Sequence, residues 1–200
     1  MTVPGRVEAA ALLLSLGPPA WFLRHSRAVA EVAAWLARRA SVTGLVLDRR
    51  LVETAALLHD VDKLLPGDDP ARRLPHGTGS ANWLERRGHG ELGPAVAGHP
   101  VTRLADARAD AWLLDASLEE RIIAYADKRA GQGLESMTER FASWRRRYPD
   151  GWSAREAAAA PARARRLEDA VCEAAGVAPD GVGRLRWTGA AFRAARERAT

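Results

Sequence analysis

The sequence predicts a protein that is almost entirely α-helical. Apolar residues recur every three or four positions in several long segments, which is typical of helices with one buried face. No segment alternates apolar and polar residues as a half-buried strand would, and β-branched residues are sparse. Glycine and proline separate the helical segments, and there are no internal repeats.

The N-terminal part of the chain contains three expected helices. The first runs from Arg6 to Leu16 and is ended by a Gly-Pro-Pro turn. The second, Trp21 to Ala40, is long and amphipathic. The third begins after Asp48, a candidate N-cap, and ends in His59-Asp60.

The rest of the chain is expected to form helices of differing length. Ser117 is a candidate N-cap for a helix whose first turn carries two glutamates, which favours the helix dipole. Thr102 to Ala116 has no clear pattern, although Trp112, Leu113 and Leu114 must be covered. One of the expected helices begins around His76 to Ser80. The others span Leu92 to Ala97, Leu118 to Ala130, Leu134 to Tyr148, Ser153 to Ala175 with an interruption near Pro161, and Ala190 to Arg198.

Length and composition fit one domain with a small appendage. The 200 residues are 47% hydrophobic, and 30 basic residues against 25 acidic ones give a net charge of +5, which suits acidic partners such as nucleotides. One cysteine, Cys172, excludes an internal disulfide and fits a reducing compartment. Without a signal segment or an apolar run of about 18 residues, we expect a soluble cytoplasmic protein with no membrane partner.

The stretch from Leu57 to Leu65 is the most informative part of the sequence. His59 and Asp60 follow an apolar helical run and would enter or border its buried face. An ionised carboxylate is costly there unless it is paired or binds a metal. A cap or a surface salt bridge is the ordinary alternative for such a pair.

Two other expected helices carry metal-capable side chains at their apolar faces. His25 lies four residues before Val29, and Asp127 lies four residues after Ile123. Each residue alone has an ordinary structural explanation, but one cation would satisfy these two residues and the central pair together. Two imidazoles and two carboxylates suit a divalent ion with open coordination positions.

The order His, His-Asp, Asp on helices resembles the HD-domain superfamily of metal-dependent phosphohydrolases. The resemblance covers Trp21 to Tyr148 and implies metal ligands at His25, His59, Asp60 and Asp127. It also implies an all-α bundle, expected to occupy residues 1–150, that hydrolyses phosphate esters or anhydrides, often of nucleotides. Residues 151–200 are then a helical C-terminal extension, packed on the bundle or partly mobile.

His76 and His99 bear on the number of metal ions. Members of the superfamily with two or three metals add two histidines in this interval, and the pair makes the site similar to that of bacterial diadenosine-tetraphosphate hydrolases. The alternative is a phosphate-binding or structural role. His89, between two glycines, is expected to be solvated. We expect one divalent ion, Mn, Fe, Co, Mg or Zn, and a second if His76 and His99 are ligands.

Lys63 is the best candidate for a phosphate ligand, because it lies one helical turn after Asp60. The only other lysine, Lys128, and its neighbour Arg129 follow Asp127 and are secondary candidates for substrate binding, with surface charge as the favoured alternative. Asp60 is expected to bridge two metals or, in a one-metal site, to help deprotonate water. Asp62 replaces the glycine of the familiar His-Asp-x-Gly-Lys form, and the sequence assigns it no role.

The predicted function is hydrolysis of a small phosphate substrate, a nucleotide or dinucleotide, by metal-activated water. Two alternatives stay open, which are a di-iron HD-type oxygenase and a non-catalytic nucleotide-sensing module. The basic stretches Trp144 to Tyr148 and Arg184 to Trp187 are interpreted as solvated surface, so nucleic acid is not the expected partner. A homodimer stays open.

Overall fold

Helices are the only regular elements among the residues that the computed structural model describes, which are 3–131, 133–149 and 153–199. A single isolated β-bridge joins Ala130 and Leu134. The predicted all-α fold is confirmed. None of the described helices is long and apolar enough to span a bilayer.

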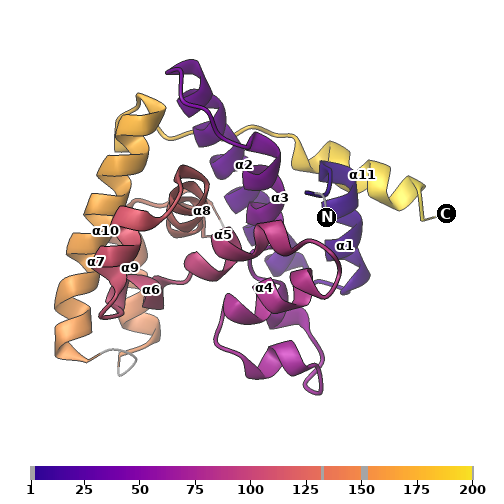
Figure 1. Cartoon of the computed structure of the whole chain (residues 1–200), viewed down its shortest axis with the longest axis horizontal. Coiled ribbons are helices and arrows are strands. Elements are labelled where there is room, and N and C mark those ends of the chain that lie inside the picture. Colours follow the sequence, from indigo (N-terminus) through magenta and orange to yellow (C-terminus); the bar gives the residue numbers. More distant parts are fainter. Residues whose placement is uncertain (1–2, 132, 150–152, 200) are drawn as a thin grey trace.

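The centre of the fold is built by three helices, α2 (Ala20–Val42), α3 (Arg49–Leu58) and α8 (Leu118–Arg129), which pack on one another (Figure 1). The short helix α5 (Gly93–Gly98) packs on both α3 and α8. Their apolar faces meet in one continuous core, to which α2 contributes the fully buried residues Phe22, Val29, Val32 and Leu36. This packing brings the start of α2 close to the ends of α3 and α8.

Both N-caps expected from the sequence are present. The Asp48 side chain accepts the backbone N–H of Leu51 at 2.9 Å and begins α3. The Ser117 hydroxyl accepts the backbone N–H of Glu120 at 3.2 Å and begins α8. These caps satisfy donors that a helix start leaves unpaired, so they help to set where the two helices begin.

The remaining elements surround the central helices. Short 3₁₀ turns and small helices follow α3 and lead into α5, whereas longer helices form the two ends of the chain (Figure 1). They are α1 (Arg6–Ser15), η1 (Val61–Leu64), η2 (Pro70–Arg73), α4 (Thr78–Glu85), η3 (Gly90–Leu92), α6 (Val101–Ala105), α7 (Ala109–Asp115), α9 (Met137–Arg147), α10 (Ala154–Ala175), η4 (Pro179–Gly181) and α11 (Thr188–Glu197).

Two expectations about these elements were wrong. Helix α10 continues through Pro161 without interruption. Proline removes one backbone hydrogen bond, but Ala160 and Leu167 are fully buried and anchor the helix on both sides of it. Leu114 is 73% exposed and finds no cover, whereas Leu113 is buried in the core and Trp112 packs half-buried against it.

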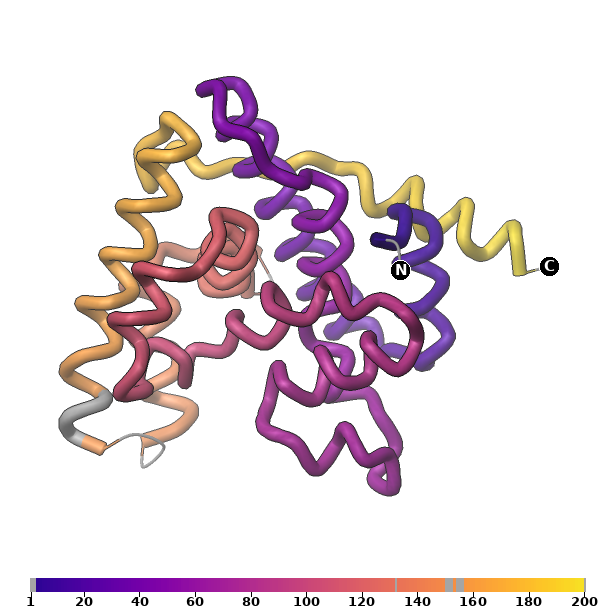
Figure 2. The backbone as a smooth tube through the Cα atoms, viewed as in Figure 1, coloured from indigo at the N-terminus to yellow at the C-terminus, as the bar shows by residue number. Residues whose placement is uncertain are grey.

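The C-terminal segment packs against the bundle. Helix α10 lies on α2, α6 and α8, and α11 lies beside α1, which brings the two ends of the chain near each other (Figure 2). Polar contacts reinforce the α10 packing, because the Tyr125 hydroxyl donates to Glu168 at 2.7 Å. The core thus includes side chains from both ends of the sequence.

This packing predicts that α10 stabilises the bundle. Leu167 is 0% exposed, so Leu167→Ala should reduce the free energy of unfolding by about 2–5 kcal/mol in a urea titration. Asp169→Ala, at an exposed position of the same helix, is the matched control and should cost little. Equal effects from the two substitutions would show that α10 adds no core packing.

Candidate metal centre

Four side chains from three central helices and the residue after α3 converge on one point. His25 lies near the start of α2, His59 is the C-cap of α3, Asp60 follows it, and Asp127 lies near the end of α8. His25 Nε2 lies 3.2 Å from His59 Nε2, 3.5 Å from Asp60 Oδ2 and 3.4 Å from Asp127 Oδ1. We call these four residues the first donor set.

A second group of donors meets the other oxygen of Asp60. His76 Nε2 and His99 Nε2 each lie 3.2 Å from Asp60 Oδ1, and the two nitrogens are 3.2 Å apart. We call Asp60, His76 and His99 the second donor set. Each set includes three ligand atoms close enough together to hold one metal ion, and Asp60 belongs to both sets.

Every histidine of the two sets is fixed through its outer nitrogen. The Nδ1 atoms of His25, His59 and His99 face the backbone carbonyls of Gly131, Ala56 and Val96 at 3.2, 2.7 and 2.6 Å. His76 Nδ1 faces the Asp62 carboxylate at 3.0 Å. Because carbonyls and carboxylates only accept, each Nδ1 is the donor, and the lone pair of each Nε2 points inward.

This arrangement fits a bound cation. Two imidazole lone pairs repel each other at 3.2 Å unless a proton or a metal ion lies between them, and both sets contain such a pair. Nitrogen and carboxylate donors in this mixture suit divalent ions of intermediate hardness. The structure therefore brings together all six residues that the sequence suggested as ligands.

The centre strongly favours positive charge. Burial alone would raise the pKa of Asp60, but the surrounding imidazoles hold it well below the usual value. Burial likewise opposes protonation of His25, yet hydrogen bonds to Asp127 and Asp60 raise its pKa to about 10. Two buried carboxylates thus require a cation among the imidazoles.

Asp62, which the sequence left without a role, supports the second donor set. Its carboxylate accepts the backbone N–H of Gly77 at 2.8 Å in addition to His76 Nδ1, and its own N–H donates to Ser80 at 3.0 Å. Gly77 has a φ of 80°, and a Cβ on Gly79 would lie 2.4 Å from the carbonyl of Ala71. These two glycines allow the chain to close around Asp62.

Lys63 lies at the solvent side of the centre. Its Nζ is 2.7 Å from Asp60 Oδ2, and its side chain is 43% exposed. Two cavities adjoin it, one of about 260 Å³ and one of about 230 Å³, and Lys63 lines both. Arg72 and His76 line the first cavity. Trp21 and Arg140 line the second together with Trp144, Arg147 and Tyr148, so the stretch interpreted as solvated surface contributes to this cavity.

Lys128 and Arg129 do not line either cavity, which corrects the expectation that they bind substrate. Lys128 is fully buried, and its ammonium donates to the backbone carbonyls of His99 and Ala124 at 2.7 and 3.0 Å. Arg129 donates to the carbonyls of Glu135 and Pro179 at 2.7 and 2.8 Å. Lys128 therefore fixes the backbone of His99.

His89 lies outside both donor sets and is half-buried, whereas the sequence predicted a solvated side chain.

Comparison with known proteins bears on this centre. A sequence profile of the HD domain matches residues 22–131, which is more than half of the chain. The chain belongs to the HD domain family. The matched region contains every residue of both donor sets.

A curated relative matches part of the chain. Ribonuclease Y of Chlorobium phaeovibrioides (strain DSM 265 / 1930) is 37% identical over 94 residues, which cover 42% of this chain and 16% of the relative. The chain thus spans only a small part of that protein's length. No solved structure matches the chain.

The contacts of Asp62 predict that it orients His76 for metal binding. Asp62→Ala should weaken the binding of an ion at the second donor set by roughly 10- to 100-fold and leave the first set unaffected. Titration of the metal-free protein with Mn²⁺ by calorimetry should then show one tight and one weakened step. Asp68→Ala, at an exposed position nearby, is the control and should leave both steps unchanged. If Asp62→Ala also left both steps unchanged, the Asp62 carboxylate would not orient His76 for metal binding.

Proposed function

We propose that this HD domain protein is a two-metal phosphohydrolase that cleaves a phosphate ester or anhydride of a nucleotide or dinucleotide. One observation carries the proposal, which is that the two oxygens of Asp60 face two different histidine pairs. A carboxylate in this position is suited to bridge two ions. Two ions held close together are the arrangement by which many hydrolases stabilise both the attacking and the leaving oxygen.

In this proposal each donor set holds one ion. His25, His59 and Asp127 would hold the first, His76 and His99 would hold the second, and Asp60 would serve both. The mixture of imidazole and carboxylate favours Mn, Fe, Co or Zn over Mg. Such ions, when bound, lower the pKa of water and polarise a phosphoryl oxygen.

The residues around the centre support a nucleotide as the substrate. Lys63 lies between the two cavities, where its ammonium can neutralise a phosphoryl group. Trp21, Trp144 and Tyr148 line the second cavity and offer aromatic faces for a base. Arg72 lines the first cavity and suits a further phosphate, because a guanidinium group can donate two parallel hydrogen bonds to phosphate oxygens.

A second candidate substrate is the phosphodiester of RNA. It is favoured by the partial similarity to Ribonuclease Y and by the run of arginines at the end of α9, where Arg147 lines the second cavity. The small volumes of the two cavities favour a nucleotide over a long polymer. Release of mononucleotides from single-stranded RNA, with no activity on free nucleotides, would favour the RNA candidate.

The first test measures phosphate release from a panel of nucleotides and dinucleotides with Mn²⁺ added. His59→Ala should lower kcat/KM by roughly a hundredfold or more, since it removes a ligand of the first ion. His89→Ala is the matched control and should retain activity. Two tightly bound irons and no hydrolysis of any phosphate would instead favour an oxygenase, and binding without turnover would favour a sensing module.

The position of Lys63 generates a second prediction. Lys63→Ala should lower kcat/KM by roughly 10²- to 10³-fold with an unchanged metal content, because the ammonium acts on the phosphoryl group. Lys63→Arg keeps the charge and should recover part of the loss. If Lys63→Ala also lost its metal, the lysine would instead serve to hold Asp60 in place.

A further inference from the structure

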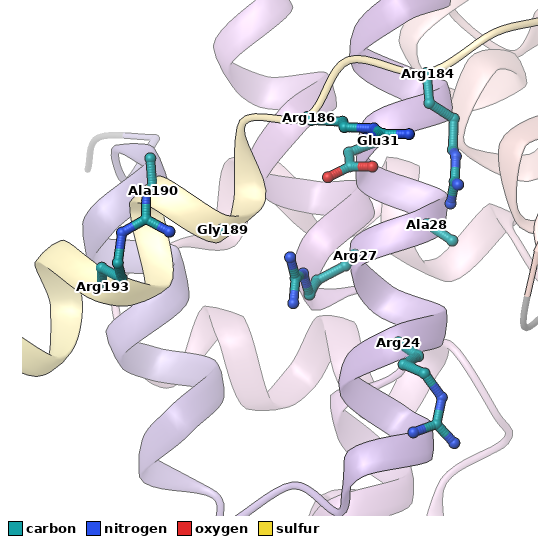
Figure 3. Close-up of a pocket in the computed structure, with 9 residues that line it drawn as sticks. All are labelled: Arg24, Arg27, Ala28, Glu31, Arg184, Arg186, Gly189, Ala190 and Arg193. Carbon is teal, nitrogen blue, oxygen red and sulfur yellow. The ribbon is translucent and has the colours of Figure 1, made fainter.

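A cavity of about 450 Å³ lies between α2, the segment that precedes α11, and α11 itself (Figure 3). It shares no lining residue with the two cavities beside the metal centre. We call it the arginine pocket. Its lining residues are Arg24, Arg27, Ala28, Glu31, Arg184, Arg186, Gly189, Ala190 and Arg193.

Four of the five arginines that line the arginine pocket form no ion pair within the described part of the chain. These four are Arg27, Arg184, Arg186 and Arg193. No carboxylate oxygen among the described residues lies within 4 Å of their guanidinium nitrogens. One glutamate also lines the pocket, and this residue, Glu31, is buried with its carboxylate bonded to the Thr188 hydroxyl at 2.6 Å. Like charges gathered around a concave surface raise its positive potential and attract anions.

A hydrogen bond holds one of these guanidinium groups in place. Arg27 Nε donates to the Thr188 hydroxyl at 3.1 Å, which leaves the ends of the side chain directed into the gap between α2 and α11 (Figure 3). A Cβ on Gly189 would lie 3.3 Å from Arg27 Nη2 and 3.7 Å from Arg193 Nη1. The absence of a side chain at Gly189 therefore lets both groups flank the same backbone position.

The lining also indicates the class of ligand. Arginine forks match phosphate oxygens, and several arginines around one cavity match several phosphates. None of the lining residues is aromatic, so a nucleic-acid base has no ring on which to stack. The volume lies in the range of small-molecule sites, roughly 300–1,000 Å³.

We propose that the arginine pocket binds a linear oligophosphate, either free or as the phosphate chain of a nucleoside triphosphate. Backbone N–H groups of the first turn of α11 add to the positive potential, because Gly189 and Ala190 both line the pocket. The site is separate from the metal centre and does not depend on the proposed hydrolysis.

Calorimetric titration with inorganic tripolyphosphate tests this proposal. The double variant Arg186→Glu/Arg193→Glu should weaken binding at least about tenfold. The matched control, Arg196→Glu/Arg198→Glu, changes the net charge equally at exposed positions outside the pocket and should bind as the unmodified protein does. Nucleotide hydrolysis, where present, should be the same in both double variants.

Further arms separate the sources and the sites. Equal affinity for tripolyphosphate and a nucleoside triphosphate assigns recognition to the phosphates, whereas a much tighter nucleotide adds the nucleoside to the ligand. Asp60→Asn, which disrupts both donor sets, should retain the binding. The proposal is overturned if the unmodified protein binds no tripolyphosphate at millimolar concentration, if both double variants weaken binding equally, if Asp60→Asn abolishes it, or if only single-stranded RNA binds in a pocket-dependent way.

Discussion

The burial of one carboxylate determines how the centre of this protein is built. Asp60 is 2% exposed, and an isolated ionised carboxylate so far from water would be strongly unfavourable. Four imidazoles surround it, two at each oxygen, and they come from four different parts of the chain. Helices α2, α3 and α5 and the turn before α4 deliver these imidazoles, so the core and the charge at its centre depend on each other.

Helix ends supply much of the geometry. His59 and His99 are the C-caps of α3 and α5, and each turns its Nδ1 back to the carbonyl three residues earlier, Ala56 or Val96. The last carbonyls of a helix lack intrahelical partners, so a histidine at this position satisfies one of them. Its Nε2 is thereby turned away from the helix. The same local bond, used twice, aims two imidazoles at opposite oxygens of Asp60.

The sequence predicted those features that depend on local periodicity and end signals. Asp48 and Ser117 were identified as caps, and the helical spacing put His25 and Asp127 at buried faces. The prediction that Lys128 binds substrate failed, because the Lys128 ammonium donates to the backbone carbonyl of His99, which caps another helix. The role of Asp62 was likewise hidden, since it depends on a turn that brings Gly77 back onto it. Such contacts between distant segments have no signal in a single sequence.

One side of helix α2 faces carboxylates that favour a cation, and the opposite side faces arginines that favour an anion. The helix itself separates these two groups of charges. His25 points toward buried carboxylates that require a cation, whereas Arg27 and Glu31 belong to the pocket that gathers arginines. Successive residues of a helix point in directions about 100° apart, so side chains two positions apart lie on nearly opposite sides. Buried apolar residues such as Val29 and Val32 fill the space around the helix. Arginines able to reach Asp60 or Asp127 would form internal ion pairs with them, which would compete with binding at the metal centre and at the proposed anion pocket.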